Sequence, residues 1–115
     1  AFDGSRKSQE AMFISAYLST QKGIPLTVLT SSEGLTNPQA IQEQAREYLS
    51  RFPLQADYRL TTDDLSEGIQ NYLESYSIDL ILIGGYGSES ILEVMLGSVV
   101  DRVLREINLP VLICR

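Results

Sequence analysis

Three glycines and a serine stand in this chain at a spacing that suits the binding of a negatively charged group. Gly84 and Gly87 are followed, after nine residues, by the pair Gly97-Ser98. The all-apolar run Leu80-Ile81-Leu82-Ile83 precedes them, and the apolar-periodic stretch 99–104 follows, which predicts a strand, a glycine-rich loop and a helix start. Glycine lets a backbone approach a ligand without a clash at Cβ, and a helix N-terminus presents free N–H groups. The spacing therefore predicts a phosphate site.

This pattern, G-x-x-G followed by nine residues and G-S, resembles the nucleotide loop of the universal stress protein family. The resemblance continues in three other segments, which are similar to the ends of the family's first, fourth and last strands: Phe2-Asp3-Gly4-Ser5, Asp79-Leu80-Ile81-Leu82-Ile83-Gly84 and Leu109-Pro110-Val111-Leu112-Ile113-Cys114. The resemblance extends over nearly the whole chain. The resemblance implies an adenine-nucleotide-binding regulatory module of the stress response.

The resemblance also implies which residues contact the nucleotide. Asp3 and Leu29 would contact the base or the ribose, and Gly84 would lie near the ribose. The phosphates would be held by backbone N–H groups of the loop and of the next helix start, together with the Ser98 hydroxyl. The residues that supply these groups are Gly87, Ser88, Gly97, Ser98 and Val99. Because ligands of open parallel sheets bind beyond the carboxyl ends of the strands, Asp3 and the glycine loop should share one crevice.

Each candidate also has a purely structural interpretation. The glycines suit tight turns, although three of them at the family's spacing favour binding. Leu29 is favoured as a core residue, and Ser98 suits an N-cap of the last helix, a role compatible with a phosphate contact. For Asp3, a cap or a solvated turn and a ligand contact are left as equal alternatives.

The charge distribution favours a weakly bound or less-charged nucleotide. The net charge of −6 arises within residues 61–115, and no Lys or Arg lies between Arg59 and Arg102. Family members often carry a cation just after the second loop glycine, where this chain has Ser88-Glu89. Arg6 and Lys7, or a Mg²⁺ ion bound mainly through the phosphates, are the available counter-charges. We expect ATP or AMP as the ligand, with or without Mg²⁺.

Composition argues against several other functions. The chain has no His, the commonest general base and transition-metal ligand, so we expect no enzyme activity beyond slow ATP hydrolysis and no metal site. It has neither the basic footprint that nucleic acid requires nor an apolar run near the roughly 20 residues of a membrane span. The single Cys114 fits a reducing compartment such as the cytoplasm.

The alternative left open is an interaction or regulatory domain that binds no nucleotide and is attached to a longer protein such as a transporter or kinase.

Strand and helix patterns alternate along the chain. Helices are expected to begin after Ser5, at Asn37-Pro38, near Leu65 and at Val99, and strands are expected at 24–29, 56–60, 80–83 and 110–114, with Ala1-Phe2 as the tail of a further strand. This alternation predicts an α/β fold with a parallel sheet. The resemblance implies an open, doubly wound, mostly parallel sheet of five strands in the order 3-2-1-4-5, with helices on both faces.

Residues 1–115 are expected to form one domain whose first strand is truncated. Only Ala1-Phe2 represent that strand, which the resemblance places at the sheet centre, so we expect a piece of a longer protein whose preceding residues are mostly Val, Ile and Leu. Strand 110–114 is apolar on both faces and should lie at the sheet edge, where an open strand pairs readily. We expect a homodimer through this strand, or a tandem domain that covers it.

Overall fold

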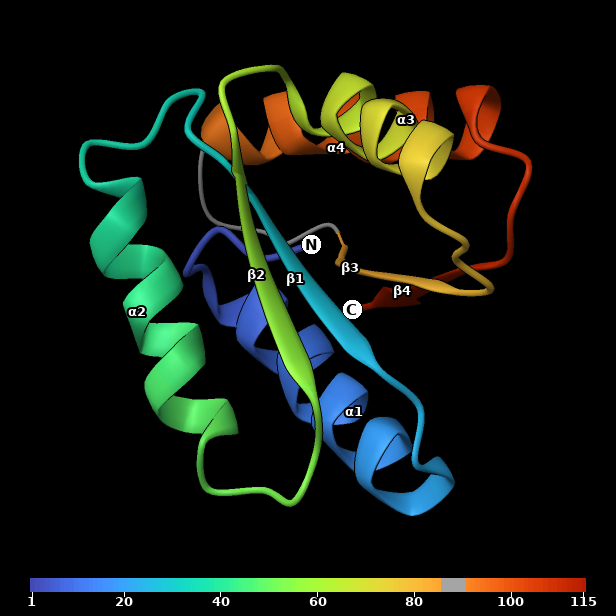
Figure 1. The fold of residues 1–115 in the computed structure, drawn as a ribbon. Helices are drawn as coiled ribbons and strands as arrows, with labels where there is room; N and C mark the ends of the chain where they lie inside the picture. The colour runs from blue at the N-terminus through green and yellow to red at the C-terminus, as the bar shows by residue number, and fades with distance from the viewer. Residues whose placement is uncertain (86–90) are drawn as a thin grey trace.

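A computed structural model describes residues 1–85 and 91–115, with residues 91–98 described by their backbone only. Helices and strands alternate along the chain (Figure 1). The elements are α1 (Arg6–Lys22), β1 (Leu26–Ser31), α2 (Pro38–Leu49), β2 (Ala56–Thr61), α3 (Leu65–Ser75), β3 (Ile81–Gly84), α4 (Ile91–Glu106) and β4 (Val111–Cys114). The predicted α/β class is confirmed.

Local capping explains where the first three helices begin. The Ser5 hydroxyl accepts a hydrogen bond from the Ser8 N–H at 3.2 Å, and the Asn37 side chain accepts one from Ala40 at 3.1 Å with Pro38 in the first helical turn. The Asp64 carboxylate accepts one from Glu67 at 3.0 Å. Each bond satisfies an N–H group that a helix start leaves without a partner.

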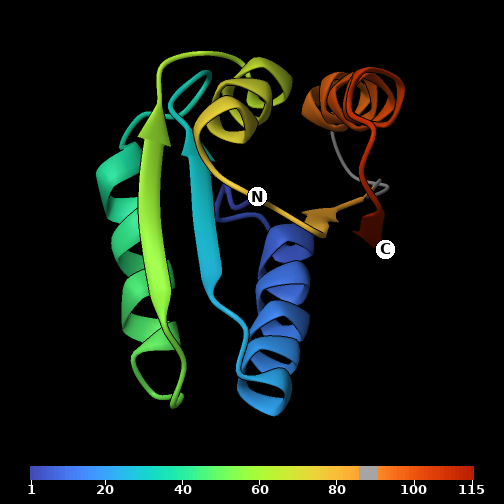
Figure 2. The same cartoon turned by 45° about the vertical axis from the view of Figure 1, so that its right-hand side comes forward.

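The four strands form two parallel pairs. β1 pairs with β2 and β3 pairs with β4, so the expected five-strand order 3-2-1-4-5 is not confirmed. The N-terminus of the chain lies between the two pairs (Figure 2). The Phe2 N–H donates to the Leu29 carbonyl at 2.9 Å, and the Ala1 amine donates to the Leu82 carbonyl at 2.7 Å. Ala1 and Phe2 thus connect β3 and β1 through one main-chain hydrogen bond to each strand.

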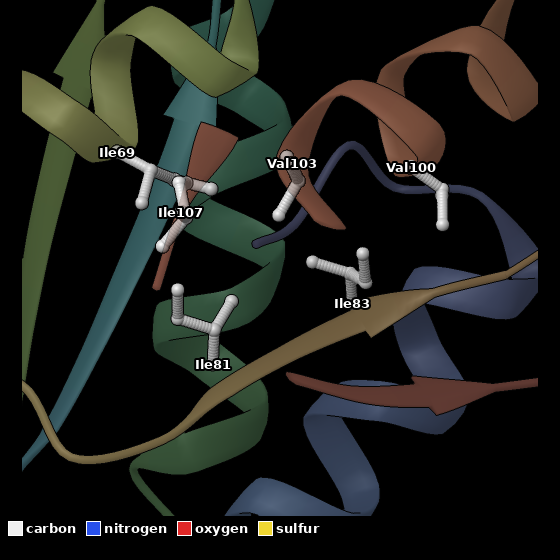
Figure 3. Close-up of a cluster of buried hydrophobic side chains, with 6 residues drawn as sticks. All are labelled: Ile69, Ile81, Ile83, Val100, Val103 and Ile107. Carbon is white, nitrogen blue, oxygen red and sulfur yellow. The ribbon is translucent and has the colours of Figure 1, made fainter. Parts of the chain in front are cut away.

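Two hydrophobic clusters lie on opposite faces of the strands. One is formed by α3, α4 and β3, and Figure 3 shows its buried residues Ile69, Ile81, Ile83, Val100, Val103 and Ile107 converging. The other is formed by Phe2 with side chains of α1, β1 and α2, namely Ala16, Val28, Ala45 and Leu49. Apolar packing on both faces is what a doubly wound sheet requires.

A polar network fixes the last turns of α4 against α3. The Arg102 guanidinium donates to Asp64 at 2.6 Å and to Glu106 at 3.0 Å, and the buried Ser66 hydroxyl donates to Glu106 at 2.8 Å. The Ser66 hydroxyl and then Arg102 hold the pKa of Glu106 below its usual value. The Glu67 N–H, with further help from Arg102, lowers the pKa of Asp64. The network therefore sets the position of the helix that carries Gly97 and Ser98.

α4 begins earlier than the sequence indicated. We expected a helix from Val99, preceded by a loop through Gly97-Ser98, but the helix starts at Ile91. The residues 91–96 are mostly strong helix formers, and their summed propensity outweighs the cost of about 1 kcal/mol for one interior glycine. Within residues 1–85 and 91–115, no helix has the length and apolar character needed to cross a membrane.

Candidate functional site

Asp3, Leu29 and Gly84 lie on neighbouring segments toward the carboxyl ends of β1 and β3. Leu29 lies in β1 and Gly84 ends β3, while Asp3 follows the dipeptide that joins these strands. Three residues from distant parts of the sequence are thereby brought to one edge. This is the edge at which parallel α/β sheets bind ligands, and the residues that lead to α4 begin there.

Asp3 has a structural role at this edge. One of its carboxylate oxygens accepts a hydrogen bond from the Ser5 N–H at 2.9 Å, which orders the turn into α1. A carboxylate offers two oxygens and about four lone-pair sites. The turn therefore fixes the side chain in place and leaves acceptor capacity for a ligand hydroxyl.

Leu29 is partly buried and packs against the hydrophobic core. Its side chain packs against the cluster below α3 and α4, and its carbonyl accepts the Phe2 N–H. These contacts support the interpretation of Leu29 as a residue that lines the core.

Gly84 and Gly85 are needed for internal packing. A Cβ on Gly84 would lie 2.5 Å from both the Lys7 carbonyl carbon and the Ser8 nitrogen, which belong to the backbone of α1. A Cβ on Gly85 would collide with the Ile113 side chain of β4. No local pattern in the sequence indicates either contact, because both partners are distant along the chain.

The structure describes only some of the other residues that were predicted to bind the nucleotide. Gly87 and Ser88 lie outside the described residues, as do Tyr86 and Glu89. Gly97, Ser98 and Val99 lie inside α4 instead of at its first turn, so the predicted capping role of Ser98 is wrong. Val99 is partly buried and packs against the cluster below α3 and α4. Backbone N–H groups in the interior of a helix are normally bonded to the preceding turn, so a phosphate there would need local opening of the helix.

Positive charge near this edge comes from the first turn of α1. The Lys7 ammonium lies 3.2 Å from the Glu10 carboxylate in a partly exposed ion pair, and Arg6 is exposed. Among the described residues, no three His, Cys, Asp or Glu side chains are grouped as a metal site. Cys114 is free and buried, and burial raises the pKa of its thiol.

A groove lies between β1 and β3. Its volume is about 380 Å³. Ser15, Leu18 and Ser19 of α1 line one side, and Ile69, Tyr72 and Leu73 of α3 line another. Its floor and ends include Ala1, Leu26, Thr27, Leu29, Leu80 and Leu82.

Comparison with known proteins places the chain in a family. The family model described as the universal stress protein family matches residues 1–115. A universal stress protein from Synechocystis is 32% identical over 117 residues, which cover 100% of this chain and 41% of the relative. The chain therefore spans less than half the length of this curated relative.

Solved structures share the fold. A universal stress protein crystallised in complex with cAMP superposes with a TM-score of 0.78 at 23% identity, covering 96% of this chain and 89% of that one. The universal stress protein of Archaeoglobus fulgidus in complex with dAMP gives a TM-score of 0.74 at 16% identity, covering 96% and 90%. From the match to the family model and the Synechocystis relative, we conclude that this chain belongs to the universal stress protein family.

Proposed function

We propose that this protein is a regulatory module that binds an adenine nucleotide at the carboxyl ends of β1 and β3. The observation that carries the proposal is that Asp3 and Leu29 lie on segments next to β3, whose end, Gly84, begins the glycine-rich segment. Two proteins of the same fold have been crystallised with cAMP and with dAMP, which supports an adenine nucleotide as the ligand class.

The roles within the site divide between two segments. Asp3 binds a ribose hydroxyl through the acceptor sites that the Ser5 N–H leaves open. Phosphate groups are held by the segment from Gly87 to Val99, including Ser88, Gly97 and Ser98. Lys7, whose backbone lies beside Gly84, supplies a cation on α1, although its pairing with Glu10 reduces the charge it offers. A nucleotide with fewer phosphates is therefore favoured over ATP, unless Mg²⁺ accompanies the triphosphate.

Isothermal titration calorimetry with AMP, ADP and ATP, each with and without Mg²⁺, tests this function. We expect saturable binding of AMP in the micromolar range or weaker, and tighter ATP binding only when Mg²⁺ is present. GMP is the matched control for the base. If none of the adenine nucleotides produces a saturable signal, the alternative function as an interaction domain attached to a longer protein gains support.

No catalytic role is proposed beyond slow hydrolysis of ATP. The chain has no His. Asp3, whose carboxylate already accepts the Ser5 N–H, is the one acidic group that we place at the nucleotide. A single carboxylate can orient water but provides no paired acid and base of the kind that efficient hydrolysis uses. Control by nucleotide occupancy fits this arrangement better than turnover, and a cytoplasmic stress response is the setting we propose.

We further propose that two copies associate through the free edge of β4. β4 pairs with β3 on one side, and Leu112 on this strand is 40% exposed. Leu112→Lys should give a folded monomer, because a charge at a pairing edge opposes strand addition. Leu104→Lys is the matched control, since Leu104 is 48% exposed on α4 and should leave the dimer intact. Light scattering at tens of micromolar decides the question, and a monomer for the unmutated protein would refute the dimer.

A further inference from the structure

α1 turns its large aromatic side chains away from the protein. Phe13 and Tyr17 are 62% and 61% exposed. The side chains that α1 buries are all small, namely Ser8, Ala11, Ser15, Ala16 and Ser19. A helix that only completes a core shows the reverse pattern, with its large apolar residues inside. The outer face of α1 is therefore unusual for a helix whose only role is packing.

Close packing explains the small inner face of α1. Its backbone at Lys7 and Ser8 lies so near β3 that a Cβ on Gly84 would be 2.5 Å from it. Large inward side chains would hold the helix away from the strands. This constraint does not extend to Phe13 and Tyr17, which face solvent. Their rings form an apolar surface that the described residues leave uncovered.

A groove beside these rings separates α1 from α2. Its volume is about 450 Å³. The buried Phe2 lies in it, with Met12 and Phe13 of α1 on one side and Tyr48 of α2 on the other. Both helices pack on the cluster that contains Phe2 and lie on one side of β1 and β2 (Figure 1). Apolar grooves of this kind accept the large anchoring side chains of a protein partner.

The outer face of α1 is positively charged, although the whole chain has a net charge of −6. α1 contains three basic residues and one acid, Glu10, which pairs with Lys7 at 3.2 Å. Arg6 and Lys22 are exposed, and neither has a carboxylate partner among the residues that the structure describes. Arg6 also lines the groove, where Gln9 and Gln44 are neutral. The surface therefore combines aromatic rings with unpaired cations.

The exposed residues Arg6, Gln9, Phe13 and Tyr17 follow one another at spacings of three or four, so they form one stripe along α1. We propose that this stripe and the groove between α1 and α2 bind an amphipathic helix of a partner protein, whose apolar residues are flanked by carboxylates. Helices with apolar residues at such spacings dock into grooves of this type. At 1.5 Å per residue, about 24 Å separates Arg6 from Lys22, so a partner helix of about four turns meets both cations.

Charge argues against a second copy of the chain as the occupant. Two α1 faces placed together would bring the Arg6 and Lys22 side chains of both copies into one interface. The acid of α1, Glu10, is already paired with Lys7. Like charges brought together in an interface oppose association, so the partner must supply the carboxylates.

The test titrates two synthetic peptides into the isotope-labelled protein and follows its amide chemical shifts. One peptide, Glu-Leu-Glu-Ala-Leu-Leu-Glu-Ala-Leu-Glu-Ala-Leu-Leu-Glu, carries the stripe and the carboxylates, and the control peptide has Gln at every Glu. We expect saturable shifts in α1 and at Gln44 and Tyr48 of α2. The control peptide should bind about tenfold more weakly at low salt. This difference should shrink at high salt, because exposed ion pairs are screened.

Variants of the protein locate the contacts. Phe13→Gln combined with Tyr17→Gln should weaken binding at least about tenfold, with Tm unchanged because both side chains are mostly exposed. Arg6→Gln should reduce the difference in affinity between the two peptides, whereas Arg6→Lys should preserve it. Leu104→Gln is the matched control, since Leu104 is exposed on α4 and its loss should leave peptide binding unchanged.

Three results of the titration would overturn the proposal: no saturable shift at millimolar peptide, equal affinity for the two peptides, or unchanged binding after loss of Phe13 and Tyr17. Light scattering of the protein alone tests the second copy. The variant with Phe13→Gln and Tyr17→Gln should keep the oligomeric state of the unmutated protein. If it converts a dimer to a monomer, another copy covers this face and the proposal is wrong.

Discussion

Gly97→Val should abolish nucleotide binding while leaving the protein folded. The proposed site holds phosphate against the backbone of the segment that contains Gly97, where a branched side chain would occupy the space of the phosphate oxygens. Gly97 lies inside α4, and valine has a higher helix propensity than glycine, so propensity alone does not lower stability. Calorimetry with AMP measures the loss of binding, and thermal unfolding of the same sample measures stability.

Gly97→Ala helps to separate the effect on nucleotide binding from the effect on stability. Alanine favours the helix over glycine by about 1 kcal/mol, yet its methyl group still intrudes on the phosphate. We therefore expect a higher Tm together with weaker AMP binding. Adenosine, which lacks phosphate, is the matched ligand control and should lose no affinity in either variant. Unchanged AMP affinity in Gly97→Val would show that the phosphate does not approach this position.

Local signals in the sequence were sufficient to predict most elements of the fold. The cap at Ser5 and the Asn37-Pro38 pair each mark a helix start through contacts within a few residues. The apolar run 80–83 predicts β3 for the same reason. The start of α4 was predicted wrongly, because Gly97-Ser98 resembles a helix boundary while the helix formers before it extend the helix to Ile91.

The candidate site depends on contacts that no local pattern reveals. The resemblance and the rule for parallel sheets predict that Asp3 and Gly84 share one site. Neither reveals that the α1 backbone passes against Gly84, because that contact forms only when α1 packs on β3. The volume of the groove between β1 and β3 also depends on how the two strand pairs are spaced, which no local pattern specifies.

Gly84→Ala should destabilise the fold through packing. The added Cβ would lie 2.5 Å from the Lys7 carbonyl carbon and the Ser8 nitrogen, and 2.8 Å from the Lys7 carbonyl oxygen. These atoms are backbone, so α1 as a whole must move away from β3. Overpacking of this kind costs about 1–3 kcal/mol. For a chain of this size each kcal/mol lowers Tm by about 4 °C or more, which thermal unfolding can resolve.

Gly23→Ala provides the control for the loss of a glycine as such. Gly23 ends α1 with φ of +64°, and no atom lies within 4 Å of an added Cβ. That variant pays only for the left-handed backbone, about 1–2 kcal/mol, and does not displace α1. Gly84→Val adds two methyl groups at the same crowded point, so its Tm should fall well below that of Gly23→Ala.

The Gly97 and Gly84 variants test different roles for two glycines of one motif: phosphate binding for Gly97 and packing for Gly84. If Gly84 acts through packing, Gly84→Ala lowers Tm, and AMP binding weakens only as far as the folded fraction falls. A Gly84→Ala protein with unchanged Tm and no AMP binding would contradict the packing role and place this glycine at the ligand. The backbone contact with Lys7 and Ser8 favours the first result, because the space that the missing side chain leaves is already occupied by α1.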